Sequence, residues 1–103
     1  MNIIFSDLAL EQLESIYNYL QTKSNQAAIF IHNNILDEIE RLREFPQMAP
    51  IEPELIGYTH TYRSLVVEKS YKVVYHYEND NVYISALFDC RQDPQKLRIY
   101  FQN

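Results

Sequence analysis

Four side chains of this sequence could together do chemistry on a phosphate, namely Arg63, Lys72, His76 and Arg91. Guanidinium and ammonium groups stabilise the charge that builds up when a phosphodiester is attacked. A histidine accepts a proton near neutral pH, whereas a lysine acting as base would need its pKa lowered by about three units. If these side chains share a surface, they predict an RNA-cleaving site in which Arg63, Lys72 and Arg91 are the catalytic candidates. His76 would then be the alternative base.

The strands that carry these residues decide which of them can meet. Residues 71–77 and 82–89 are rich in Tyr, Val and Ile and are separated by Asn79, Asp80 and Asn81, which predicts an antiparallel hairpin. A loop of Asn79-Asp80 or of Asp80-Asn81 gives the same division of faces. One face, expected to be the core face, carries Tyr71, Val73, Tyr75, Tyr77, Val82, Ile84, Ala86 and Phe88. The opposite, polar face carries Lys72, Val74, His76, Tyr83, Ser85, Leu87 and Asp89.

A further strand is predicted at residues 62–67, which read YRSLVV, and a tight turn at Glu68-Lys69 would join it to the hairpin. In this register Leu65 lies opposite Lys72. Arg63 and Lys72 then share the polar face as diagonal neighbours, within roughly 8 Å at the backbone. We therefore expect a basic surface on the open side of the sheet.

Five further side chains of the sequence remain to be assigned. Arg91 follows the last strand and should lie at the margin of the polar face. Tyr83 could support a bound base by stacking, although most tyrosines are expected in the core and the sheet. His32 and His60 have no sequence partner that suggests metal binding, so we expect no metal ion and no cofactor. Cys90 is the only cysteine, which excludes an internal disulfide and predicts a partly buried thiol.

Two amphipathic helices are predicted to cover the core face. The first follows the cap candidates Ser6 and Asp7, and its apolar residues recur at Ala9, Leu13, Ile16, Tyr17 and Leu20. The second runs from about Gln26 to Glu44, with Ser24 or Asn25 at its start and Ala28, Ile31, Ile35, Ile39 and Leu42 along one side. The short link between them predicts an antiparallel pair.

The remaining segments complete one α+β domain spanning residues 1–103. Residues 2–5 are expected to form a short strand at the sheet edge, and Pro46, Pro50 and Pro53 enforce an extended connection after the second helix. The predicted fold is an N-terminal antiparallel helical hairpin packed on a curved, mainly antiparallel sheet of about four strands.

Charge and hydropathy limit the classes of protein to consider. The net charge is −5, and residues 1–54 hold nine acidic and three basic side chains. This balance argues against a protein that grips naked nucleic acid over its whole surface, since such binding depends on Lys and Arg. No apolar run approaches the length of a membrane span and no signal peptide is recognisable, so we expect a cytoplasmic protein.

The order strand, helix, helix, three strands, together with FPQMAPIEPEL, YRSLVV, SYKVVYHY and FDCRQDP, resembles the RelE/ParE superfamily of toxins. These are the toxins of bacterial type II toxin–antitoxin systems and include plasmid-stabilisation proteins. The resemblance covers nearly the whole chain and implies a partner antitoxin whose extended or helical segment wraps the toxin in an oligomeric complex. It also implies that operator DNA is bound only through the antitoxin.

The superfamily divides by mechanism. Members resembling RelE cut messenger RNA on the ribosome, whereas members resembling ParE inhibit DNA gyrase. RelE-like nucleases usually carry a second basic residue where this chain has Leu65, and a second one after Arg91 where it has Gln92. The missing charges favour a ParE-like toxin that binds its target. The alternatives are a metal-independent endoribonuclease acting on messenger RNA, or a degenerate toxin that retains only antitoxin binding.

The polar face also suggests where the antitoxin binds. Apolar side chains lie there among charged ones, so an acidic amphipathic segment could bury the former and pair with the latter. The expected antitoxin contacts are Arg63, Leu65, Lys72, Val74 and Leu87. On this hypothesis Arg63→Glu weakens the complex.

Overall fold

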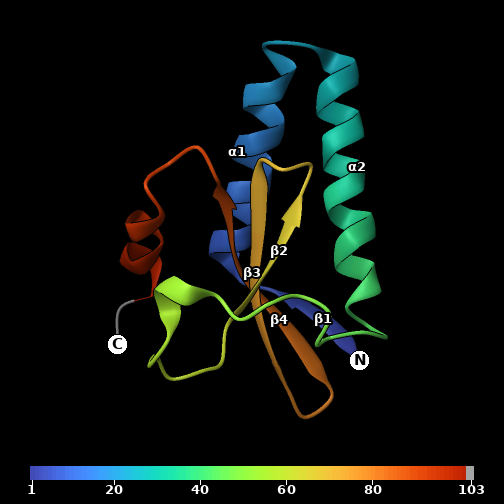
Figure 1. Cartoon of the computed structure of the whole chain (residues 1–103). Coiled ribbons are helices and arrows are strands. Elements are labelled where there is room, and N and C mark those ends of the chain that lie inside the picture. The colour runs from blue at the N-terminus through green and yellow to red at the C-terminus, as the bar shows by residue number, and fades with distance from the viewer. Residues whose placement is uncertain (102–103) are drawn as a thin grey trace.

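The computed structural model describes residues 1–101, which form four strands, two α-helices and two short 3₁₀ segments (Figure 1). In chain order the elements are β1 (Asn2–Phe5), α1 (Asp7–Gln21), α2 (Asn25–Arg41), η1 (Pro53–Leu55), β2 (Arg63–Val67), β3 (Tyr71–Glu78), β4 (Asn81–Asp89) and η2 (Pro94–Tyr100). The predicted α+β fold is confirmed. No helix in this part of the chain has both the length and the apolarity that crossing a membrane requires.

The two helices begin where the sequence places their caps. Ser6 Oγ accepts a hydrogen bond from the backbone N–H of Ala9 at 3.0 Å, and Ser24 Oγ accepts one from Ala27 at 3.2 Å. Such caps satisfy amide groups that have no partner within the helix. The second helix was predicted to reach Glu44 but ends at Arg41, because the next backbone hydrogen bonds tighten to i→i−3 turns.

The sheet has the order β1-β4-β3-β2. The hairpin β3–β4 and the pair β2–β3 are antiparallel, whereas β1 lies parallel to β4 at one edge. The predicted edge position of residues 2–5 is therefore confirmed. Figure 1 shows α1 and α2 side by side, with the red C-terminal segment η2 lying apart from them.

The first half of the β3–β4 hairpin follows the predicted register. The loop is Asn79-Asp80, and Asn79 adopts a left-handed φ of 56°. Tyr77 pairs with Val82, and Tyr75 pairs with Ile84. Asn is among the residues that tolerate this conformation best, which explains why the turn could be read from the sequence.

The second half of this hairpin differs from the prediction because β4 contains a β-bulge. Val74 pairs with Ala86, which leaves Ser85 as an extra residue opposite the step between Val74 and Tyr75. A bulge breaks strict alternation and reverses every side chain beyond it. Leu87 therefore enters the main core, and Ala86 turns to the opposite face. The predicted faces of both residues, and of Phe88, were wrong.

The turn between β2 and β3 also differs from the prediction. Val67 pairs with Tyr71, so the loop contains three residues, Glu68, Lys69 and Ser70. Glu68 and Lys69 have φ values of 53° and 58°, and the Ser70 N–H donates to the carbonyl of Val67 at 3.2 Å. Neither residue type signals a left-handed turn, so this turn could not be predicted from the residue types.

This one extra loop residue decides the orientation of β2. Arg63 pairs with Tyr75, and Val66 pairs with Lys72. Since paired residues in a sheet point to the same side, Arg63 and Lys72 lie on opposite faces. The predicted shared basic surface is therefore wrong.

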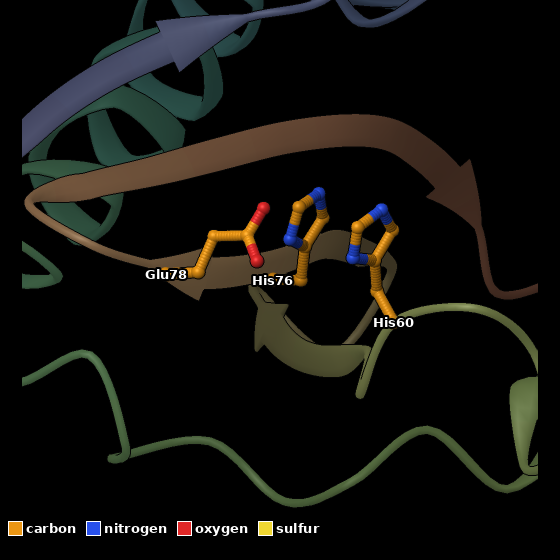
Figure 2. Close-up of side chains that lie close together, drawn as sticks. All are labelled: His60, His76 and Glu78. Atoms are coloured by element: carbon orange, nitrogen blue, oxygen red, sulfur yellow. The ribbon is translucent and has the colours of Figure 1, made fainter.

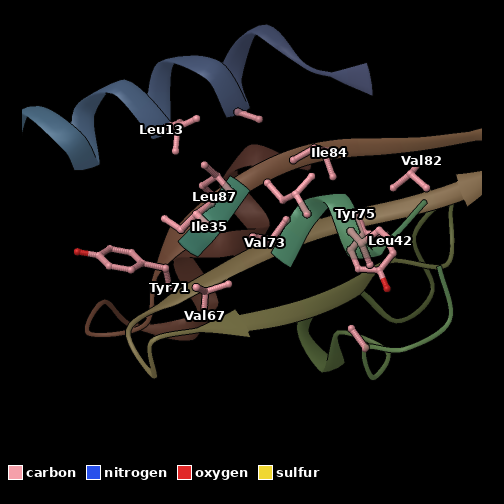
Figure 3. Packing of buried hydrophobic residues seen from close by; sticks show 13 residues of the cluster. Leu13, Ile35, Leu42, Val67, Tyr71, Val73, Tyr75, Val82, Ile84 and Leu87 are labelled. Atoms are coloured by element: carbon pink, nitrogen blue, oxygen red, sulfur yellow. The ribbon is translucent and has the colours of Figure 1, made fainter. Parts of the chain in front are cut away.

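Apolar side chains fill both sides of the sheet. The main core lies between the helices and the sheet (Figure 3), and its buried residues include Leu13, Ile35, Ile39, Leu42, Val73, Tyr75, Val82, Ile84 and Leu87. A second cluster occupies the other face beneath η1 and η2, and its buried residues are Leu55, Val74, Ala86, Phe88, Leu97 and Phe101. The face that was expected to be wet and open is thus largely covered.

Candidate functional site

Arg63 is held by the proline-containing connection between α2 and β2. Its Nη1 donates to the carbonyl of Ala49 at 2.8 Å and to that of Gln47 at 3.4 Å. Its guanidinium carbon lies 6.0 Å from the centroid of the Tyr77 ring, which adds a weak cation–π contact. Arg63 thus links the connection to the sheet through hydrogen bonds from Nη1 to backbone carbonyls.

Lys72, on the opposite face, forms an ion pair with Glu52. The distance from Lys72 Nζ to Glu52 Oε1 is 2.7 Å, and the Glu52 side chain is fully buried. The same oxygen accepts from Ser64 Oγ at 2.8 Å, and Oε2 accepts from the Glu54 backbone N–H at 2.8 Å. Burial alone would raise the pKa of Glu52, but these hydrogen bonds outweigh it and hold the pKa below its usual value.

The role of Glu52 was missed in the sequence. Its position beside Pro53 in a connection without periodicity gives no indication of where the side chain points. The only signal available was two carboxylates, Glu52 and Glu54, in an otherwise apolar segment, IEPEL. The ammonium group of Lys72 is therefore paired with a buried carboxylate.

Arg91 lies just beyond β4 and pairs with the last residue of that strand. Its Nη2 is 2.6 Å from Asp89 Oδ2, and its Nε is 3.0 Å from Asp89 Oδ1. The hydrogen bonds from Arg91 lower the pKa of the Asp89 carboxyl below its usual value, against a smaller effect of burial. The Arg91 side chain is 62% exposed, so it remains the most accessible of the three basic candidates.

His76 is 9% exposed and lies within a group of rings. The His60 ring stacks on it at 3.8 Å between centroids, with an interplanar angle of 9°, and the Tyr83 ring stacks at 4.9 Å. Tyr62 meets it edge-on at 5.4 Å. Burial, followed by the neighbouring His60, lowers the pKa of His76, while Glu78 opposes the shift.

Within the described residues, the basic candidates do not come together into the predicted phosphate site. Arg63 faces one side of the sheet and Lys72 faces the other, and each is bound to a protein oxygen. Arg91 is paired with Asp89. The three cations therefore contact different parts of the protein.

The predicted antitoxin groove is also divided by the sheet. Val74 is fully buried in the second cluster, whereas Leu87 is 3% exposed in the main core. Leu65 is half-buried and packs against the main core. These three apolar residues therefore do not form one accessible surface.

An open hollow lies elsewhere, between α1, the end of β4 and η2. Its volume is about 520 Å³, and it is lined by residues that include Ile16, Tyr19, Leu87, Asp89, Arg91 and Tyr100. Tyr19 and Tyr100 are 50% and 41% exposed. We call this hollow the α1–η2 groove. It combines an apolar floor, exposed aromatic rings and an accessible guanidinium, which are features of protein-binding surfaces.

A second arrangement that sequence reasoning missed joins His60, His76 and Glu78 (Figure 2). One ligand atom from each lies within 4.8 Å of the others. His76 and Glu78 are two positions apart on β3, so their side chains share a face. The sequence could have indicated this. His60 comes from the irregular segment before β2, and its position could not be read from spacing.

Comparison with known proteins agrees with this fold. Residues 3–94 match the family model described as the ParE toxin of the type II toxin–antitoxin system parDE. Among solved structures, the chromosomal ParDE toxin–antitoxin system from P. aeruginosa is similar, with a TM-score of 0.73 and 17% sequence identity. The match covers 86% of this chain and 95% of that chain.

A comparison with curated proteins finds no significant match. The family match, however, extends from β1 past the end of β4, and so includes both helices and every strand of the sheet. The chain therefore belongs to the ParE toxin family of type II toxin–antitoxin systems.

Proposed function

We propose that this toxin inhibits growth by binding a cellular target, with DNA gyrase as that target, and that it does not cleave RNA. The observation that carries the proposal is the separation of Arg63 and Lys72 on opposite faces of the sheet, each bound to a protein oxygen. Cleavage of a phosphodiester needs cations and a base around one phosphate. Arg63 and Lys72 instead make contacts that stabilise the fold.

The position of His76 supports the same proposal. A general base must reach the proton that it removes, within about 3 Å or through one water. The His76 ring is 9% exposed and stacks on both His60 and Tyr83, so a substrate hydroxyl would have to displace a neighbouring ring to reach it.

The two mechanisms are separated by paired assays on the same purified toxin. A gyrase supercoiling assay should show inhibition at micromolar toxin, relieved when the cognate antitoxin is added first. In a translating extract, messenger RNA should stay intact. Codon-dependent cuts that disappear in Lys72→Ala would overturn the proposal, and unaffected supercoiling would exclude gyrase as the target.

A degenerate toxin is distinguished by growth. Expression in a host without the antitoxin should stop growth, followed by a change in plasmid supercoiling before any loss of messenger RNA. Normal growth, combined with intact antitoxin binding by the same protein, would instead indicate a chain that retains only the binding function.

For the antitoxin we propose the α1–η2 groove as a contact. Its aromatic rings and the exposed Arg91 suit an amphipathic segment with an acidic side chain, because buried aromatic and arginine anchors dominate most interfaces. Arg63→Glu is not a clean test of antitoxin binding, because it would also break the hydrogen bonds to Ala49 and Gln47.

The groove is tested with Arg91→Glu. The variant should bind the antitoxin at least about tenfold more weakly, a loss of about 1.4 kcal/mol. Arg41→Glu is the matched control, because Arg41 is 60% exposed on α2 and also pairs with a nearby carboxylate, that of Glu38, at 3.0 Å. Equal affinities of both variants in a titration would place the antitoxin elsewhere.

A further inference from the structure

His60, His76 and Glu78 form a group of potential ligands at the end of β3 (Figure 2). The group lines a hollow of about 380 Å³, shared with Thr59, Thr61 and Arg63. Figure 2 shows the two imidazole rings face to face and the Glu78 carboxylate beside His76. The ligand atoms of the three residues lie within 4.8 Å of one another.

One ring nitrogen of His76 is buried without a hydrogen-bond partner. Within residues 1–101, His76 Nδ1 is buried and has no hydrogen-bond partner. A buried polar atom without a partner costs about 1–3 kcal/mol, so native structures rarely leave one without a reason. The surrounding rings of His60, Tyr62 and Tyr83 offer aromatic contacts but leave this nitrogen unpaired.

The ligand types define the class of ion. Two imidazole nitrogens and one carboxylate oxygen are a common zinc-binding set that leaves a fourth position for water or another ligand. Imidazole suits Zn²⁺, Cu²⁺ and Ni²⁺, whereas Ca²⁺ and Mg²⁺ prefer sites made of oxygen. We propose that His60, His76 and Glu78 bind one divalent transition-metal ion of this class.

Binding requires a local change that the segment around His60 can accommodate. Tetrahedral ligation at about 2.0–2.1 Å places ligand atoms about 3.3 Å apart, and the ion must lie near the plane of each ring. The stacked rings must therefore turn away from their 9° interplanar angle. His60 lies outside every helix and strand, so its ring can turn without breaking a sheet hydrogen bond.

The charges around the hollow are compatible with a cation. Glu78 is exposed and forms no ion pair within the described chain, so its carboxylate is available. Arg63 lines the same hollow and would repel an ion, but its Nη1 is directed to the carbonyls of Ala49 and Gln47. A bound ion would join the connection before β2 to the end of β3.

The test uses tag-free, metal-stripped protein titrated with Co²⁺ and, separately, with Zn²⁺. Visible absorption of Co²⁺ reports nitrogen and oxygen ligation, and calorimetry reports the stoichiometry. We expect one ion per chain. At a hundredfold excess of Zn²⁺ over its Kd, Tm should rise by about 10 °C or more, because the ion binds only the folded chain.

Variants assign the ligands. His60→Ala and Glu78→Gln should each weaken binding at least about tenfold and change the Co²⁺ spectrum. Both residues lie at the surface side of the site, so these variants should fold. Far-UV circular dichroism checks that they do. His32→Ala is the matched control, because His32 lies on α2 against the Tyr17 ring, away from the site.

Two results would overturn the proposal. One is the absence of stoichiometric Co²⁺ and Zn²⁺ binding at submillimolar concentrations in the wild-type chain. The other is binding that survives unchanged in both His60→Ala and Glu78→Gln, which would assign the ion to other carboxylates. Neither result depends on the target of the toxin, so the proposed function is tested separately.

Discussion

Glu52 is a buried carboxylate whose three hydrogen bonds fix the connection between α2 and β2 onto the sheet. Lys72, Ser64 and the Glu54 backbone each donate to it. A buried charge is stable only when it is paired and fully hydrogen-bonded, and removal of one partner is costly. Lys72, which in isolation looks like a catalytic group, is thereby a structural residue.

The first prediction concerns the stability of Glu52→Gln against pH. Since the pKa of Glu52 is lowered in the folded chain, ionised Glu52 stabilises the fold above its unfolded pKa, and this contribution is lost as pH falls through the folded pKa. At pH 7 the substitution should lower the free energy of unfolding by about 1–3 kcal/mol. The difference from wild type should shrink as the pH falls below about 4.

Urea unfolding at several pH values measures this difference. Glu40→Gln is the control, because Glu40 also has a lowered pKa, due to its hydrogen bond with Arg43, but lies exposed on α2. It should change stability little at any pH, since solvent screens an exposed pair. A Glu52→Gln difference that stayed constant down to pH 3 would contradict an ionised, hydrogen-bonded Glu52.

At this scale the sequence identified the right residue types but not their partners. Arg63, Lys72 and His76 were chosen as catalytic candidates because they are charged or titratable groups in a strand pattern. Their partners are Ala49, Glu52 and His60, which come from the irregular segment between α2 and β2. Periodicity says nothing about where such a segment places its side chains.

At the scale of elements, one extra residue in the β2–β3 turn and one in β4 determine which side chains share a face. Ser6 and Ser24 mark the helix starts clearly, because capping depends on local chemistry. The bulge at Ser85 and the left-handed turn at Glu68 involve residue types that do not signal such conformations. The strands and the faces of β3 and of the first half of β4 were therefore predictable, whereas the faces of β2 and of β4 beyond the bulge were not.

The bulge leads to a prediction for Leu87→Ala. Strict alternation would place Leu87 on the polar face, but the structure buries it, with 3% exposed. The substitution should lower the free energy of unfolding by about 2–5 kcal/mol, through lost burial and the cavity left behind. Leu10→Ala on α1 is the matched control at 49% exposure and should cost far less. Equal losses in chemical denaturation would contradict the burial of Leu87 in the core.

The C-terminal segment η2 supplies a third prediction, for Leu97→Ala. Leu97 is 1% exposed and packs with Phe88 and Val74 on the face of the sheet away from the main core. We expect a loss of about 2–5 kcal/mol and greater binding of a hydrophobic dye. Ile99→Ala, two residues away and 63% exposed, should behave as wild type. No dye binding by the Leu97 variant would mean that η2 is not needed to cover this face.

At the scale of the whole molecule, the two apolar clusters share one sheet. Neighbouring residues of β3 belong to different clusters, because Val73 faces the helices and Val74 faces η2. Loss of either cluster would expose one side of the same strand. The overall fold was predictable because it depends on the order and type of the elements, but the second cluster was not, since η2 is short and lacks a regular apolar pattern.

This arrangement predicts a single cooperative unfolding transition. Far-UV circular dichroism, which follows the helices, and tyrosine fluorescence, which also reports rings near the second cluster such as Tyr58 and Tyr62, should give the same midpoint in urea. Separate midpoints for the two signals would show that the η2 side unfolds independently of the helical side.

The parallel pairing of β1 with β4 has a consequence for the order in which a nascent chain can fold. Residues 2–5 leave the ribosome well before their strand partners, which are Asn81, Val82, Tyr83 and Ile84. The helical hairpin needs only local contacts, whereas this sheet edge must wait until most of the chain has been synthesised. A polypeptide released before Asn81 would therefore contain both helices but leave its first strand without a partner.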